Sequence, residues 1–385
     1  MANTYLIGLP GMGKQTLMYE MILNDIERRR GVVFIDPHGS AIDALLPYLP
    51  RSRMDDIILF DPSDPQHLIP WCPLDVSGDP SLIASMIESA IKDAAGYGNT
   101  STPTMSLYIR NAIYALLESN QPLVGLPFIL MSEAYRRTIL QAVSDPLVTK
   151  FWEAFEGLGP KERRQEIAST FNKAFALILD KRIRHTLTLT QSAFSIGDVF
   201  KGKILLVRLP QGSLGREQVQ TIGAMLLAQF HLSAMAGGKN PPTSVYIRDA
   251  QKFDGTIVAD MFASLSDYGV SVTVSNQNLG QLSPDLLAAI LGNSHRQYIF
   301  RISIKDDLVL NQDIRPKHSV TQLYELPPMT AREFHDLQVT DHTVMPIRSV
   351  RDDRMPALVR EHMRHNFAQR ASKLERAFKA FLRAA

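Results

Sequence analysis

The sequence predicts an α/β protein with a mostly parallel sheet, interrupted by an all-helical insertion and followed by a helical tail. Three observations predict this class. Strand-length apolar runs alternate with helical patterns near the N-terminus, the middle of the chain has helical periodicity with few β-branched runs, and strand-length runs return before a final amphipathic segment. With 385 residues, the chain is long enough for a core domain that carries an inserted second domain.

Strands and helices alternate over the first part of the chain. Apolar runs at residues 5–9, 32–35 and 57–60 predict short buried strands, and helical patterns at 14–29 and 41–49 separate them. Pro and Gly punctuate the short loops between these segments. This β-α-β-α-β order favours parallel strands with helices packed on the sheet.

The pattern changes near residue 81. Helices are expected at residues 82–93, 105–118, 134–143 and 161–179. Strands are expected again at residues 203–209, 244–249, 270–275 and 297–302, with a long helix at 218–236. The predicted domains are a core at 1–80 and 200–350, an all-helical insertion at 81–199, and a basic amphipathic helical tail at 351–385.

Composition excludes several classes of protein. The single cysteine, Cys72, cannot form an internal disulfide or a cysteine-rich zinc site, and a buried small apolar role is expected for it. No apolar run reaches the roughly 20 residues that a membrane-spanning helix needs. The N-terminus lacks a charged leader before a long apolar stretch, so a cytoplasmic location is expected.

A glycine-rich loop lies between the first predicted strand and the first predicted helix. Residues 8–14, Gly-Leu-Pro-Gly-Met-Gly-Lys, match the pattern G-x-x-x-x-G-K. Glycines let backbone N–H groups surround phosphate oxygens, the helix N-terminus favours negative charge, and Lys14 adds a point charge. The alternative is a glycine-rich turn with an unrelated lysine, but the strand-loop-helix context favours phosphate binding. The residues expected to bind nucleotide here are Gly8, Pro10, Gly11, Met12, Gly13, Lys14, Gln15 and Thr16.

The residue after Lys14 departs from the pattern, which expects a Ser or Thr hydroxyl as a magnesium ligand. Gln15 offers an amide oxygen instead, on a longer side chain. Thr16 lies about 100° further around the helix and cannot simply replace the missing hydroxyl. We therefore expect ATP and Mg²⁺ as cofactors, with Gln15 as a candidate magnesium ligand and with metal-dependent hydrolysis weakened.

The predicted strand at 244–249 ends at Arg248 and Asp249. Hydrolases with such a phosphate loop need a carboxylate there for the metal, and usually a neighbouring acid to activate the attacking water. Asp249 is therefore a candidate catalytic acid and magnesium ligand. Arg248 stands where a metal-site aspartate is expected; it would repel a metal ion but could pair with phosphate. The alternative is an edge strand that ends in a solvated Arg–Asp pair.

Several segments along nearly the whole chain carry a family resemblance through their order and spacing. After the phosphate loop they are Asp36-Pro37-His38-Gly39, residues 58–64, 71–74 and 203–207, Asp249-Ala250-Gln251-Lys252-Phe253, residues 275–282, and Phe300-Arg301. Together they resemble the DNA-pumping ATPases related to type IV secretion coupling proteins, which are TraG-like and HerA/FtsK-like.

The resemblance implies a RecA-like P-loop core assembled as a hexameric ring, with ATP between subunits and double-stranded DNA in a central channel. It implies that Lys14 contacts phosphate, that Gln277 senses it, and that Arg301 reaches the neighbouring subunit's nucleotide from a strand end. Asp36, by default a turn residue, becomes a residue expected to line the nucleotide site. By default, Arg301 would be a surface or core-edge arginine.

Three departures from the family pattern matter. Gln15 and Arg248 both alter the metal site, from two separate segments. Family members also place membrane helices or a small β-domain before the phosphate loop, whereas here the first strand starts almost at Met1. Any membrane anchoring is therefore expected to come from a partner.

Three functions stay open. The first is an ATP-driven DNA translocase; the second is a catalytically degenerate ring component that scaffolds or regulates a partner ATPase, nuclease, relaxase or secretion machine. The third is a remodelling or secretion ATPase that does not use DNA, because the net charge of +2 does not demand nucleic acid. Residues 351–385 carry nine Lys or Arg against four Asp or Glu. This tail suits DNA phosphates or ring packing, or is a solvated face with a packed stripe.

Overall fold

The structure, a computed structural model, describes residues 2–94, 96, 102–253, 256–314, 322–335 and 338–385. The chain divides into two compact units. The first, which we call the sheet unit, comprises Met1–Phe60, Ile196–Gly212 and Gly237–His362. The second, the helical unit, comprises Asp61–Ser195, Ser213–Ala236 and Met363–Ala385.

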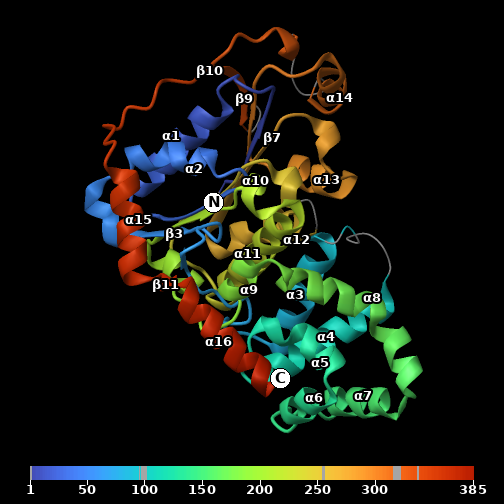
Figure 1. Cartoon of the computed structure of the whole chain (residues 1–385). Coiled ribbons are helices and arrows are strands. Elements are labelled where there is room, and N and C mark those ends of the chain that lie inside the picture. The colour runs from blue at the N-terminus through green and yellow to red at the C-terminus, as the bar shows by residue number, and fades with distance from the viewer. Residues whose placement is uncertain (1, 95, 97–101, 254–255, 315–321, 336–337) are drawn as a thin grey trace. The chain divides into compact units, whose positions relative to one another are not determined.

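A nine-stranded sheet forms the centre of the sheet unit (Figure 1). In order across the sheet, its strands are β10 (Gln338–Thr343), β9 (Thr330–His335), β8 (Arg296–Ile299), β1 (Thr4–Ile7), β7 (Val270–Asn276), β6 (Thr243–Ile247), β2 (Gly31–Asp36), β5 (Ile204–Arg208) and β3 (Ile57–Phe60). Pairing is parallel from β3 through to β8 and antiparallel only at β8–β9 and β9–β10. The predicted α/β class with a mostly parallel sheet is confirmed.

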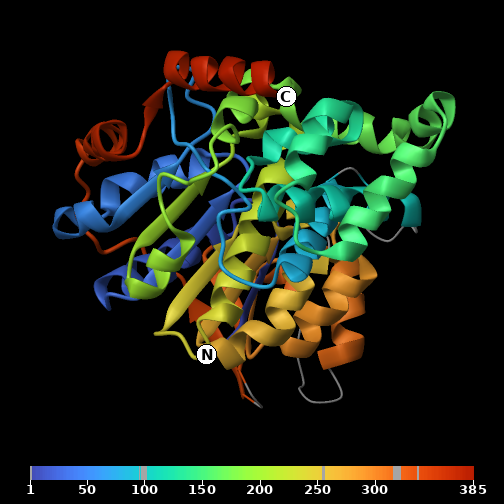
Figure 2. The ribbon, with the colours of Figure 1, turned by 90° about the horizontal axis from the view of Figure 1, so that it is seen from below.

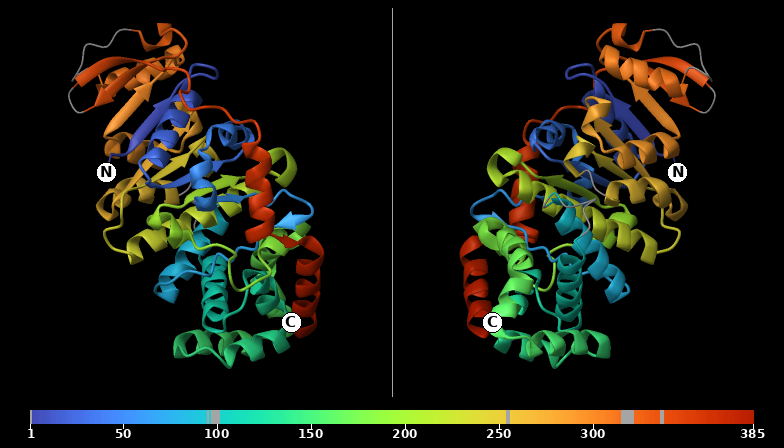
Figure 3. Two further views of the ribbon diagram at one scale, coloured as in Figure 1. Left: turned by 90° about the vertical axis from the view of Figure 1, so that its left-hand side faces the viewer. Right: turned by 90° about the vertical axis from the view of Figure 1, so that its right-hand side faces the viewer.

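Helices cover both faces of this sheet, which explains why β1, β2 and β3 are buried along their whole length. The helices of the unit are α1 (Lys14–Glu27), α2 (Ser40–Leu45), α12 (Thr256–Ser264), α13 (Pro284–Asn293) and α14 (Ile304–Ile314), with α15 (Met355–Asn366) at its end. Helices α1 and α2 lie on one face, and α12 and α13 on the other (Figure 3).

The direction of the crossovers reverses beside β1. The connections after β1 and β2 lead toward the β3 edge, whereas those after β6 and β7 lead toward β8. Because such crossovers are right-handed, this reversal puts the two sets of helices on opposite faces. A crevice is therefore expected at the carboxyl ends of β1, β6 and β7, where ligands of open α/β sheets bind.

The helical unit contains residues 81–195 of the stretch 81–199 predicted as the insertion, together with residues 61–80 and 213–236, which were assigned to the core, and the last helix of the tail. Its helices are α3 (Pro80–Ala94), α4 (Pro103–Glu118), α5 (Leu126–Met131), α6 (Glu133–Leu140), α7 (Pro146–Gly157), α8 (Pro160–Leu179), α9 (Lys181–Thr186), α11 (Arg216–Ala236) and α16 (Ala371–Ala384), and the short α10 (Gln211–Leu214) lies at the boundary. Helix α3 packs against α4 and α11, and α16 lies beside α9 (Figure 2). Two short strands, β4 (His67–Leu68) and β11 (Gln369–Arg370), pair antiparallel.

Helix α11 is the one helix of the described residues that is long and apolar enough to cross a membrane. However, 78% of its most apolar stretch is buried inside the protein. Its composition is therefore that of a core helix, and its mostly apolar surface is accounted for by packing against its neighbours.

The structure corrects the end of the strand predicted at 297–302. Strand β8 ends at Ile299, so Phe300 and Arg301 do not lie in a strand. The backbone turns there to contact the phosphate loop, where the Leu9 N–H donates to the Arg301 carbonyl at 2.7 Å. The β9–β10 hairpin (orange-red at one edge of the sheet in Figure 3) was not predicted, since most β10 side chains are polar and exposed at the edge of the sheet. Helix α14 was not predicted either.

Candidate functional site

The phosphate loop connects β1 to α1 and passes very close to the segment after β8. Gly8 has φ +154° and Gly13 has φ +113°. A Cβ on Gly8 would lie 2.6 Å from Phe300 Cβ, and one on Gly13 would lie 3.1 Å from the Phe300 ring and from Met329 Sδ. Glycine is therefore required at both positions, and the loop backs onto Phe300 while the first-turn amides of α1 have no acceptor within the helix.

Lys14 begins α1 and folds over the loop. Its Nζ donates to the carbonyl oxygens of Gly8 and, at 2.9 Å, of Leu9. Burial lowers the pKa of Lys14 to about 8; the charge of Asp249 opposes this shift, and that of Arg248 adds to it. An anionic ligand in front of the loop would relieve both the burial cost and the repulsion from Arg248.

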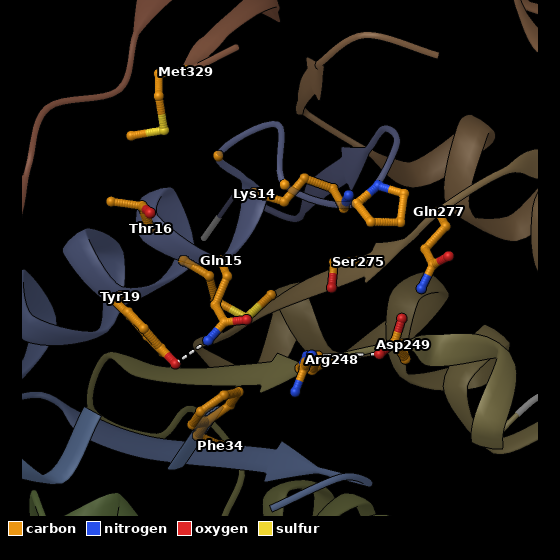
Figure 4. Close-up of a pocket in the computed structure, with 14 residues that line it drawn as sticks. Lys14, Gln15, Thr16, Tyr19, Phe34, Arg248, Asp249, Ser275, Gln277 and Met329 are labelled. Atoms are coloured by element: carbon orange, nitrogen blue, oxygen red, sulfur yellow. Dashed lines mark hydrogen bonds and ion pairs between the residues drawn. The ribbon is translucent and has the colours of Figure 1, made fainter. Parts of the chain in front are cut away.

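A cavity of about 360 Å³ opens in front of the loop, at the carboxyl ends of β1, β6 and β7. Its lining residues are Pro10, Gly11, Gly13, Lys14, Gln15, Thr16, Met18, Tyr19, Phe34, Arg248, Asp249, Ser275, Gln277 and Met329. Figure 4 shows that these side chains come from the loop, from α1 and from the strand ends. The volume and the mixture of apolar walls with a few charged groups suit a small anionic ligand.

Arg248 follows β6 and is held in the site by Asp36 at the end of β2. Its Nη1 lies 3.1 Å from Asp36 Oδ1 and 3.2 Å from Ser40 Oγ. The fully buried Asp36 carboxylate also accepts the backbone N–H groups of His38, Ala41 and Ile42. Asp36 is not among the cavity-lining residues. It fixes the start of α2 and anchors Arg248, which does line the cavity.

Asp249 lies next to Arg248 with a left-handed backbone, at φ +51°. Its Oδ2 is 3.1 Å from His38 Nε2 and 3.6 Å from Arg248 Nε, and its Oδ1 accepts from Gln251 Nε2 at 3.3 Å. A non-glycine residue in this conformation is uncommon and is often found at functional sites. Asp249 therefore reaches the cavity as a carboxylate already engaged by a histidine and an arginine.

Gln15 lines the cavity from α1, but part of its amide is already engaged. Its Nε2 donates to the Tyr19 hydroxyl, one turn further along the helix, and that hydroxyl donates to the Ala41 carbonyl at 2.6 Å. In Figure 4 the Gln15 amide lies between Tyr19 and Arg248, with its oxygen on the side of the cavity. Thr16 also lines the cavity.

These residues fit a nucleoside triphosphate, but they do not fit the magnesium ion that usually accompanies its phosphates. Loop amides, Lys14 and Arg248 are donors that phosphate oxygens need. Among the residues that the structure describes, no group of three or more His, Cys, Asp and Glu is placed to hold a metal ion. Nucleotide-bound magnesium needs no such cluster, but it does need a compact oxygen ligand and a nearby uncompensated carboxylate. Here Gln15 and Arg248 occupy those two places.

The two residues proposed for catalysis beside Asp249 lie in different surroundings. Gln277 follows β7 and lines the cavity; its backbone N–H donates to Gln281 Oε1 at 3.0 Å, which fixes the turn. Arg301 does not line the cavity. Its Nε donates to the Leu326 carbonyl at 2.6 Å, and its own carbonyl accepts from Leu9. Within this chain, Arg301 therefore ties the phosphate loop to the segment before β9.

Several cavity residues were not identified from the sequence. Met329 has φ +61°, and its N–H donates to the Met12 carbonyl at 2.9 Å, so the segment before β9 is joined to the phosphate loop. No local pattern indicates this contact, because it joins segments more than 300 residues apart. Tyr19 and Ser275 had weak signals: one lies a helical turn after Gln15, and the other lies in β7 near its carboxyl end.

Comparison with known proteins places this fold. No family model matches the chain, and no curated protein matches its sequence. Among solved structures, the plasmid coupling protein TrwB with a non-hydrolysable ATP analogue is similar with a TM-score of 0.64 and 15% identity, over 91% of this chain and 86% of TrwB. TrwB with ADP and Mg²⁺ has a TM-score of 0.61 and 14% identity, over 92% and 87% of the two chains.

A second kind of protein has the same fold. VirB4 of Thermoanaerobacter pseudethanolicus is similar with a TM-score of 0.63 and 13% identity, over 90% of each chain. At these identities the likeness concerns the fold. The predicted RecA-like P-loop fold is therefore confirmed, and it is the fold of TrwB and VirB4.

Proposed function

We propose that this chain is a nucleotide-binding subunit of a ring ATPase that moves DNA, with slow hydrolysis. The observation that carries this proposal is the phosphate loop at Gly8–Lys14, which opens onto a cavity shared with Asp249 and Gln277. The fold it shares with a conjugative coupling protein, solved with an ATP analogue and with ADP and Mg²⁺, supports the proposal. The ring is proposed to be a hexamer of this chain around double-stranded DNA.

The cavity residues suggest a division of roles. Loop amides and Lys14 bind the β- and γ-phosphates, Asp249 accepts a proton from the attacking water, and Gln277 orients that water or the γ-phosphate. Arg301 is proposed to act on the nucleotide of a neighbouring copy, and its bond to Leu326 would set its position. Asp249 is already paired with His38 and Arg248 and would have to share its oxygens between them and the attacking water, which is why slow turnover is expected.

A second function is favoured by Arg248 itself. An arginine fixed by Asp36 at the metal position suits a site that binds nucleotide and holds it without turnover. The chain would then be a catalytically degenerate ring component that scaffolds or regulates a partner ATPase, a nuclease, a relaxase or a membrane-bound secretion complex. A cytoplasmic location fits either function.

ATP turnover with magnesium, with and without double-stranded DNA, separates the two functions. The control is Lys14→Ala, which removes the charge closest to the loop. We expect measurable turnover that rises with DNA and is lost in the variant. ATP binding without turnover, abolished by Lys14→Ala, would instead assign the chain to the regulatory role. If neither protein binds ATP, the nucleotide-binding proposal is wrong.

A further inference from the structure

We infer that the cavity takes its nucleoside triphosphate without a divalent cation, and that Arg248 brings the positive charge that the cation supplies elsewhere. This inference rests on the proposed nucleotide-binding function and names the cofactor state of the same site. It concerns binding, and it holds for either of the two functions proposed above.

The position of Arg248 is the first argument. The side chain lies within the cavity below Gln15 and Ser275 and beside Asp249 (Figure 4). It is 23% exposed, and Asp36, a carboxylate with no exposed surface, holds it through Nη1. Within the described part of the chain, its other terminal nitrogen, Nη2, has no hydrogen-bond partner. The guanidinium is thus fixed in place with donors left for an anion.

The second argument is that a metal ion would have to displace existing partners. A magnesium ion beside the phosphates and the end of β6 would lie next to the positively charged Arg248 guanidinium. Two like charges in contact repel strongly in a partly buried site. The carboxylate that could attract it, Asp249, is already 3.1 Å from His38 and 3.6 Å from Arg248. Gln15 could offer one neutral oxygen, while its amide nitrogen bonds to Tyr19.

The third argument is the chemistry of arginine. A guanidinium presents planar, paired donors that match phosphate oxygens and keeps its charge at any physiological pH. Lys14 and Arg248 already repel each other across the cavity, since Arg248 contributes to the lowered pKa of Lys14. A metal-free triphosphate between them would satisfy both cations, whereas a magnesium complex would carry less negative charge to the same site.

The test is the affinity for ATP, measured by calorimetry on the full chain, once with excess Mg²⁺ and once with EDTA. We expect the two dissociation constants of the unmodified protein to agree within about threefold, because the cation contributes little. In EDTA, Arg248→Ala should weaken binding by about tenfold or more, the loss expected for a charge-assisted hydrogen bond. Arg248→Lys keeps the charge and should lose less.

Arg208→Ala is the matched control. Arg208 also ends a strand, is 19% exposed, and pairs with an aspartate, Asp43, at 2.8 Å, but it does not line the cavity. Arg208→Ala should leave the affinity for ATP in EDTA unchanged. Thermal unfolding checks that this variant is folded. Equal losses in Arg208→Ala and Arg248→Ala would overturn the role of Arg248.

The measurement on the unmodified protein needs no variant and decides by itself whether ATP binding requires the cation. If EDTA weakens ATP binding by about tenfold or more, the cation is required and the inference is wrong, while the proposed nucleotide binding stands. If ATP binds under neither condition, the proposed function fails first and the inference with it.

Discussion

At the scale of single residues, the close approach of Phe300 decides which loop glycines can be replaced. Gly8→Ala would put a Cβ 2.6 Å from Phe300 Cβ, so we expect it to lower the free energy of unfolding by about 1–3 kcal/mol through overpacking. Gly11 also has a positive φ, of +78°, but a Cβ there meets nothing within 4 Å. Gly11→Ala should cost only about 1 kcal/mol of backbone strain. Urea unfolding measures both, and equal costs would contradict the packing argument.

A second prediction concerns the charge on Lys14. The protonated amine binds phosphate, and the pKa of Lys14 in the free protein is about 8, so the affinity for ATP should fall as the pH rises through that value. Arginine keeps its charge over this range, and Lys14→Arg should therefore remove the pH dependence while keeping some binding. ATP titrations at about pH 7 and about pH 9.5 test this. A decline of the same size in both proteins would assign the effect to another group.

At the scale of elements, α16 is an amphipathic helix that both apolar packing and ion pairs attach to the helical unit. Leu374 is fully buried and Phe378 nearly so, and the Phe381 ring lies 5.5 Å from that of Phe128 in α5. Glu375 accepts from His185 at 2.7 Å. Burial raises the pKa of Glu375, but the bonds from Lys181 and His185 outweigh it and hold the pKa at about 2. The helix is therefore packed as well as charged.

The prediction at this scale compares two leucines on α16. Leu374→Ala should lower the free energy of unfolding of the helical unit by about 2–5 kcal/mol, because it empties a buried position. Leu382 lies two turns further along the same helix, yet it is 42% exposed. Leu382→Ala should change stability by less than about 0.5 kcal/mol. Hydrogen exchange of α16 in both variants measures the difference, and similar exchange rates would mean that α16 is not held by its apolar face.

At the scale of the whole molecule, the proposed binding of DNA depends on basic side chains that packing leaves exposed. Deleting the chain after Met355 is expected to weaken ring assembly or DNA retention, but it would also uncover the apolar partners of α16. Replacing the exposed Lys373, Arg376 and Arg383 with Gln keeps the helix. DNA affinity should fall in this variant, and the slope of log affinity against log salt should flatten by up to about 0.9 for each DNA phosphate that the variant no longer neutralises.

The control for this experiment removes as many exposed charges from elsewhere on the helical unit. It replaces Lys150, Lys161 and Arg164 with Gln. If both triple variants lose the same affinity, the effect is one of net charge rather than of α16. If neither loses any, α16 does not bind DNA, and its basic residues are a solvated face.

The sequence by itself determined the fold class and the position of the phosphate loop. Both depend on local information: strand-length apolar runs, helical periodicity, and a glycine pattern between the two. Gly8, Gly13 and Lys14 could be named because they belong to this local pattern, although the approach of Phe300 to both glycines could not be predicted. The polar β9–β10 hairpin could not, because nothing in its composition distinguishes an edge strand from a loop.

Only the tertiary structure decided how the strand-end residues relate to one another. Asp36 and Arg248 are 212 positions apart in the chain, and the sheet order brings β2 beside β6, so that the buried carboxylate anchors the arginine inside the cavity. Likewise, Met329 joins the phosphate loop to the segment before β9 through a backbone bond, and Arg301 does so through its carbonyl on one side and its side-chain Nε on the other. Local sequence patterns predict whether each segment is a strand, a helix or a loop. The order of the strands in the sheet determines which carboxyl ends are neighbours, and the contacts between these ends determine the chemistry of the site.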